Sequence, residues 1–177
     1  MKDRRGEKSL FLTACHEAGH AVAAARLGYM CGVVTIVPDG DKWTAGHAAT
    51  EDAWDDPEAN ILVCLAGYVA ELEAGKEEQT ARAGAAGDFE QALGWLGDTA
   101  READLAPYLP KARELVRENW AAIERVAAEL VARQTIDGDM VEMLRDVADG
   151  NATEEDFARY CQLVKAPLPR GYKEAAE

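Results

Sequence analysis

Residues 14–28, ACHEAGHAVAAARLG, contain an HExxH motif that runs from His16 to His20 and decides the fold. Residues on a helix advance about 100° each, so His16 and His20 project from one face, one turn apart. Two imidazoles at that spacing can bind a single zinc ion. Glu17 falls at the edge of the same face, where a carboxylate can act as general base toward a metal-bound water.

The residues around the motif support a helix. The flanking stretches LFLTA and AVAAARL are apolar and helix-forming and contain no proline. The alternative is a helix in which the pattern occurs by coincidence and binds no metal. The continuous helical context favours the zinc interpretation.

Length and composition are those of a globular protein. The chain has 177 residues, of which 48% are hydrophobic and 29% charged. We expect a single domain over residues 1–165, with a metal-site core over 10–100 and a helical part over 101–165. Residues 166–177 are expected to form a flexible tail.

The charge balance argues against two classes of partner. The formal net charge is −14. No basic patch is present to bind nucleic acid or an anionic membrane surface. There is no signal-peptide apolar region, and no apolar run approaches the length of a membrane span. The four cysteines show no CxxC spacing, so we expect free thiols and a cytoplasmic location.

Hydrophobic periodicity and turn residues predict a mainly helical chain with a small amount of strand. A mobile connection is expected over residues 75–87, which contain three glycines and no apolar stripe. Strands are expected at 31–38 and around 43–49. Helices are expected at 10–27 with Ser9 as the cap, 57–74, 87–97, 101–133 with breaks near Pro107 and Pro110, 138–148, and 153–164.

The third zinc ligand is not determined by the motif. Catalytic zinc usually takes three protein ligands and a water. The chain has three histidines, and the motif uses two of them. Either His47, in a turn-rich loop, or a carboxylate must supply the third ligand.

Five stretches, in order, resemble the peptidase domain of FtsH-type ATP-dependent zinc proteases. They are HEAGHAVAA, VVTIVPDG, LAGYVAELEAG, AGAAGDFEQAL and the late segment ARELVRENWAAIERVAAELVARQTIDGDMVEML. The family shows an HEAGH helix, a VTIxPRG strand, an LGGRAAEE helix and a TGAxxDF segment, followed by closing helices. The resemblance spans about residues 10–145. It implies a mainly α (α+β) fold: a helical, zincin-like peptidase domain with a small β-sheet beside the HExxH helix and a C-terminal helical bundle.

The resemblance also implies roles for individual residues. It gives His16, His20 and Asp88 as ligands of one Zn²⁺ per chain, and Glu17 as the general base. The alternative for Asp88 is a helix-cap residue that binds no metal. Glu71 matches an acidic position of the family and is expected to orient a ligand imidazole; an ordinary solvated glutamate is the alternative.

In the family, the strand after the motif helix aligns the substrate as an added strand. The corresponding residues are expected to bind substrate here. They are Val33, Val34, Thr35, Ile36 and Val37.

The sequence also departs from the family. It shows no AAA+ ATPase module and no membrane anchors, and LAGYVAELE lacks the arginine and the double glycine of LGGRAAEE. We therefore expect a zinc metalloendopeptidase that hydrolyses flexible or unfolded peptides without ATP. The alternative is a non-catalytic peptide-binding or regulatory domain that retains the fold.

A separate ATPase or a second copy of the chain is a further possible partner. Trp54, Trp95 and Tyr108 are candidates for such a surface, with core packing as the alternative role.

Overall fold

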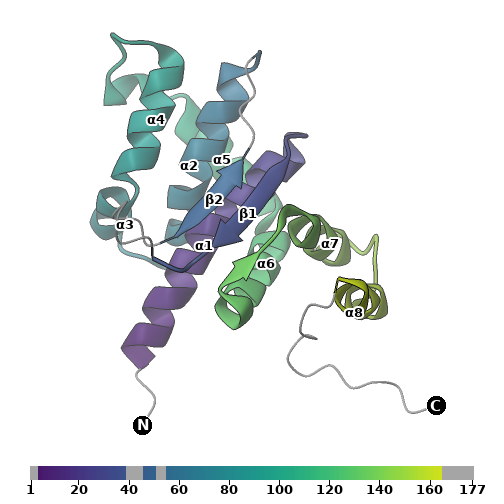
Figure 1. Cartoon of the computed structure of the whole chain (residues 1–177). Coiled ribbons are helices and arrows are strands. Elements are labelled where there is room, and N and C mark those ends of the chain that lie inside the picture. The colour runs from purple at the N-terminus through teal and green to yellow at the C-terminus, as the bar shows by residue number, and fades with distance from the viewer. Residues whose placement is uncertain (1–3, 39–45, 51–54, 165–177) are drawn as a thin grey trace, which may run out of the picture.

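The computed structural model describes residues 4–38, 46–50 and 55–164 (Figure 1). Within these ranges the chain forms eight α-helices, a short 3-10 helix and a three-stranded sheet, as the mainly helical prediction requires. The helices are α1 (Arg4–Arg26), α2 (Pro57–Glu73), α3 (Glu78–Gly84), α4 (Ala86–Leu96), α5 (Tyr108–Glu118), α6 (Trp120–Arg133), α7 (Gly138–Ala148) and α8 (Glu154–Leu163), with η1 at Glu102–Leu105. None of the helices in these ranges combines the length and apolar character that a membrane span needs.

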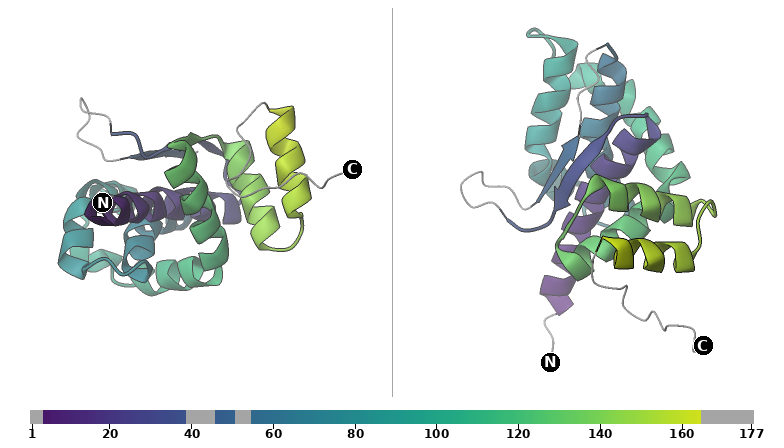
Figure 2. Two further views of the ribbon diagram at one scale, coloured as in Figure 1. Left: turned by 90° about the horizontal axis from the view of Figure 1, so that it is seen from below. Right: turned by 45° about the vertical axis from the view of Figure 1, so that its right-hand side comes forward.

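Helix α1 carries the HExxH motif and is the central element of the fold. It packs against α2 and α6 on one side and against the sheet on the other (Figure 2). Ala14, Cys15, Ala18 and Val22 are fully buried along it. The helix begins at Arg4, earlier than the predicted start after Ser9, because the charged residues before the motif are themselves good helix formers.

The contact between α1 and α2 is unusually close. A Cβ added at Gly19 would lie 2.7 Å from the backbone oxygen of Ala66 and 2.9 Å from the Cβ of Ala70. Glycine on α1, facing two alanines on α2, therefore lets the two helix backbones approach each other where any larger side chain would hold them apart.

The sheet has the strand order β2–β1–β3, and all its pairs are antiparallel. Its strands are β1 (Cys31–Thr35), β2 (His47–Thr50) and β3 (Thr135–Ile136). Val34 of β1 pairs with Ala48 on one side and with Ile136 on the other. Strand β3 was not predicted, because a two-residue strand carries no periodicity. Trp43, part of the predicted second strand, lies outside the described residues.

The position of β1 corrects the prediction for Val33–Val37. Both edges of β1 are occupied over Val34 and Thr35, so a peptide cannot add to this strand there. Ile36 donates its backbone N–H to Gln134 as well. Val33 and Val37 are exposed, whereas Val34 and Ile36 are buried in the core.

A mobile connection was predicted over residues 75–87, but most of this stretch is helical. Glu77 caps α3 by accepting hydrogen bonds from the backbone N–H groups of Gln79 and Thr80. Ala81 and Ala85 are fully buried. The prediction was wrong because the buried residues of this stretch are alanines, which are not hydrophobic enough to give a clear apolar stripe in the sequence.

The helical region after residue 101 is divided differently from the prediction. Pro107 and Pro110 lie at the start of α5, where proline is tolerated, and the break between α5 and α6 falls at Asn119. The hydrophobic core is continuous from α1 to α8, since Ala14, Leu130, Leu144 and Phe157 belong to one buried cluster. The predicted tail, 166–177, lies outside the described residues.

A bidentate ion pair joins the end of α1 to the end of α7. Arg26 donates hydrogen bonds of 2.7 and 2.6 Å to the two carboxylate oxygens of Asp149, and both side chains are about three-quarters buried. The hydrogen bonds from Arg26 hold the pKa of Asp149 below its usual value. A depressed carboxylate pKa contributes stability that is present above the unfolded-state pKa, near 4, and is lost as the pH falls through the folded-state pKa.

Asp149→Asn is therefore expected to lower the free energy of unfolding by about 1 kcal/mol at pH 7. The difference from the wild type should shrink as the pH falls below about 4. Urea unfolding at several pH values measures it. The control is Arg159→Gln, which changes an exposed side chain and should alter the free energy of unfolding little. A difference for Asp149→Asn that is independent of pH would contradict the assignment.

Candidate metal centre

Three side chains from two helices converge on one point. Nε2 of His16 lies 3.0 Å from Nε2 of His20 and 3.0 Å from Oδ2 of Asp88. Nε2 of His20 lies 3.7 Å from Oδ1 of Asp88. One nitrogen or oxygen from each of the three residues falls within 4.8 Å of the others. The structure thus brings together the three residues that were predicted as ligands.

Asp88 comes from the first turn of α4, where the helix dipole favours a negative charge. The N-cap of α4 is Ala85, and no side chain caps this helix. The carboxylate of Asp88 is directed at the two imidazoles instead, which removes the alternative that it serves only as a helix cap.

Each imidazole has a partner for its second nitrogen. Nδ1 of His20 lies 2.8 Å from the backbone oxygen of Val63 on α2. A carbonyl oxygen only accepts hydrogen bonds, so Nδ1–H is the donor, and in the neutral ring Nε2 then keeps its lone pair. Nδ1 of His16 faces Oε2 of Glu71 at 3.7 Å. Glu71 is only 3% exposed, so it is not the solvated glutamate of the alternative interpretation.

The neighbouring groups also shift the pKa values of His16 and Asp88. Burial opposes a proton on His16, but the Asp88 and Glu71 carboxylates outweigh it and raise the pKa of His16 to about 10. Burial likewise opposes ionisation of Asp88, yet its contacts with His16 and His20 hold its pKa well below the usual range. The carboxylates that attract a proton to this point would equally attract a cation, which must displace that proton to bind.

Gly67 on α2 makes room for the two rings. A Cβ at this position would lie 2.9 Å from Nε2 of His16 and would run into the ring of His20. The sequence interpretation did not single out Gly67. Its signal was present, because a glycine inside an otherwise apolar helix costs about 1 kcal/mol relative to alanine and calls for a packing reason.

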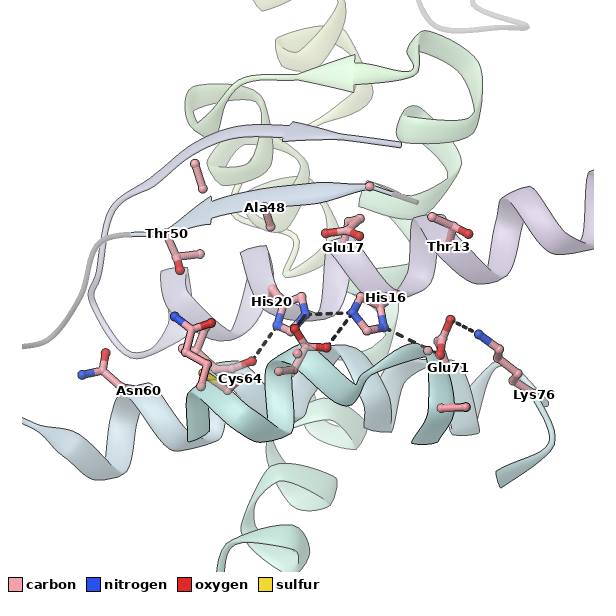
Figure 3. Close-up of a pocket in the computed structure, with 18 of the residues that line it drawn as sticks. Thr13, His16, Glu17, His20, Ala48, Thr50, Asn60, Cys64, Glu71 and Lys76 are labelled. Atoms are coloured by element: carbon pink, nitrogen blue, oxygen red, sulfur yellow. Dashed lines mark hydrogen bonds and ion pairs between the residues drawn. The ribbon is translucent and has the colours of Figure 1, made fainter. Parts of the chain in front are cut away.

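Glu17 lies beside the histidines on the face of α1 that is turned toward β2 (Figure 3). It is 6% exposed, and burial raises its pKa although His20 and His16 oppose the shift. Gly46, just before β2, covers it: a Cβ there would lie 2.6 Å from Oε1 of Glu17. Gly46 is a second close contact that the sequence interpretation missed.

A cleft of about 830 Å³ contains the whole arrangement. Strand β2 borders it on one side, through Ala48, Ala49 and Thr50. Helices α1, α2, α3 and α4 form the remaining walls. Of the predicted strand residues, none of Val33, Val34, Thr35, Ile36 or Val37 lines it. The backbone of His47 lies in β2, but its side chain is outside the described part of the structure.

Two of the three aromatic residues proposed as a partner surface lie in the described part of the chain, and one of them, Trp95, also lines the cleft. Trp95 and Tyr108 are partly buried against the hydrophobic core, in agreement with the packing alternative. Trp54 lies outside the described residues.

The donor set fits zinc. Two imidazole nitrogens and one carboxylate oxygen are one of the ligand combinations found in catalytic zinc sites. Here each imidazole has a partner for its second nitrogen, and the carboxylate lies near the start of a helix. These three donor atoms lie close together on the wall of an open cleft.

Comparisons with known proteins identify no family for this chain. No known family matches the sequence, and no curated protein matches it either.

Proposed function

We propose that this protein is a zinc-dependent endopeptidase with the zincin-like fold of FtsH-type peptidase domains, acting on flexible or unfolded peptides. The observation that carries the proposal is the convergence of His16, His20 and Asp88 in a cleft that also contains the buried carboxylate of Glu17. His16, His20 and Asp88 would hold the metal. Zinc, when bound, supplies a Lewis acid that acidifies water and polarises a carbonyl.

Glu17 would act as the general base and then the general acid. Its raised pKa brings the carboxylate closer to the pH at which proton transfer is most effective. It would take a proton from the water that attacks the scissile carbonyl and deliver it to the leaving amide nitrogen. The neighbouring Gly46 would leave the carboxylate room at the cleft wall.

Strand β2 is the element that would align the substrate. Among the described strands it is an edge strand, and Ala48, Ala49 and Thr50 line the cleft. An extended peptide could pair with its backbone beside Glu17 and the histidines. The small side chains of Ala48 and Ala49 would admit a peptide without demanding one residue type, which fits an unfolded substrate.

The test is metal analysis followed by hydrolysis of fluorescein-labelled casein, a natively unstructured protein. We expect about one zinc ion per chain. Cleavage should stop on chelation and return when zinc is supplied. Loss of a residue that supports a metal ligand lowers metal affinity by about ten- to hundredfold. Asp88→Ala removes a proposed ligand itself, so its zinc affinity should fall further than that.

Three other results would each count against the proposal. Absence of zinc after zinc is supplied would overturn the metal site. Zinc retained at full affinity in Asp88→Ala would move the third ligand elsewhere, with His47 as the candidate. Zinc bound without cleavage of casein or of a random peptide library would favour the non-catalytic peptide-binding alternative.

A further inference from the structure

The C-terminal end of α2 holds a lysine against the buried carboxylate of Glu71. Nζ of Lys76 donates a hydrogen bond of 2.5 Å to Oε1 of Glu71. The Lys76 side chain is 20% exposed and the Glu71 side chain 4%. A Cβ at Gly84 would lie 3.4 Å from Nζ, so the end of α3 closes over the ammonium group. The ion pair is therefore largely shielded from water.

The turn that follows α2 places Lys76 there. Gly75 has a φ of +85°, the left-handed conformation that suits glycine. Gly75 donates its backbone N–H to Leu72, and Lys76 donates its own to the backbone oxygen of Glu71. These two bonds form a Schellman motif, which folds the chain back over the last turn of the helix. Lys76 is thus fixed by backbone hydrogen bonds beside the residue whose carboxylate it contacts.

The other oxygen of Glu71 faces the metal site. Among the described residues Oε2 has no hydrogen-bond partner, although it is fully buried. Nδ1 of His16 lies 3.7 Å from it. A carboxylate this deeply buried needs a polar partner at each oxygen, because a buried polar atom without one is costly. Lys76 satisfies Oε1, and His16 is the group placed to satisfy Oε2.

We propose that Lys76 is a positioning residue that acts through Glu71 on His16. Through its hydrogen bond to Oε1 it holds the Glu71 side chain in place and directs Oε2 toward Nδ1 of His16, so that Nε2 of the imidazole is presented to the cleft. The inference rests on the proposed function only in taking His16 as a metal ligand. It assigns Lys76 no contact with substrate.

Lys111 provides a matched control. Its Nζ donates a hydrogen bond of 2.6 Å to Oε1 of Glu58, also on α2, but that pair is about half exposed and touches no ligand. Lys76→Met and Lys111→Met therefore each remove one lysine–glutamate contact from the same helix. Only the first contact leads to the metal site.

The measurement is zinc affinity, by competition with a chromophoric chelator at fixed pH. We expect Lys76→Met to weaken zinc binding by about ten- to hundredfold, the range found when a ligand loses its supporting partner. Lys76→Arg should restore most of the affinity, and Lys111→Met should leave it unchanged. The visible spectrum of the Co²⁺-loaded protein should change in Lys76→Met and not in Lys111→Met.

A double substitution tests the route through Glu71. If Lys76 acts only by way of Glu71, then adding Lys76→Met to Glu71→Gln should weaken zinc binding no further. Additive losses would overturn this route. Should Lys76→Met fail to fold, Lys76→Gln and the Glu71→Gln pair carry the same test.

The outcomes separate this inference from the proposed function. Wild-type protein that binds no zinc would overturn the function itself. Wild-type protein that binds zinc, together with a folded Lys76→Met of equal affinity and unchanged Co²⁺ spectrum, would overturn only the role of Lys76.

Discussion

Glu17→Gln is expected to retain zinc at wild-type affinity and to hydrolyse casein about 10²–10⁴-fold more slowly than the wild type. Glutamine has the same shape, so it fits beneath Gly46 in the space that Glu17 occupies, at 6% exposure. It cannot take a proton from water. The proposed ligands His16, His20 and Asp88 are unchanged, and so the metal should stay.

Initial cleavage rates and metal content, measured on the same preparations, check this prediction. Glu90→Gln is the control, because Glu90 lies on α4 close to Asp88 in sequence but is exposed to solvent. Glu90→Gln should keep both zinc and activity. Undiminished cleavage by Glu17→Gln would remove Glu17 from the reaction.

Gly67→Ala is expected to weaken zinc binding by about ten- to hundredfold, although alanine is the better helix former. The added methyl group would stand where the ring of His20 lies and 2.9 Å from Nε2 of His16. The imidazoles must then move apart or turn away. Overpacking of this kind costs about 1–3 kcal/mol, which exceeds the gain in helix propensity of about 1 kcal/mol.

Gly94→Ala is the matched control for this substitution. Gly94 lies in α4, and a Cβ added there meets nothing within 4 Å. We expect Gly94→Ala to gain up to about 1 kcal/mol in the free energy of unfolding and to bind zinc normally. Calorimetry and chelator competition give both quantities. Normal zinc binding by Gly67→Ala would show that the rings do not rest on the α2 backbone.

Some of this arrangement could be read from the sequence because it depends on local periodicity. The HExxH spacing placed His16 and His20 on one face of a helix, and the apolar spacing of residues 57–74 predicted α2 within a residue at its end. Gly28 and Gly75, both with a φ of +85°, each follow directly on a predicted helix, 10–27 and 57–74. Asp88 required the resemblance to a family, because nothing local links α4 to α1.

What could not be predicted depends on contacts between distant segments. The pairing of β1 with β3 joins residues about a hundred positions apart, and it is this pairing that closes the second edge of β1 to a substrate. Val63 contributes a backbone oxygen, which no side-chain pattern reveals. Gly46 and Gly67 matter for the side chain that they lack, and this becomes visible only when the neighbour is known.

The close contact of α1 and α2 at Gly19 has a thermodynamic consequence for the cation. The helices are held together by buried apolar side chains and by close backbone approach. We therefore expect the geometry of the proposed ligands not to depend on the ion, in contrast to a zinc finger. Chelation should therefore yield a folded apoprotein. The melting temperature should rise with free zinc only as mass action requires, and the site should accept zinc or cobalt repeatedly without refolding.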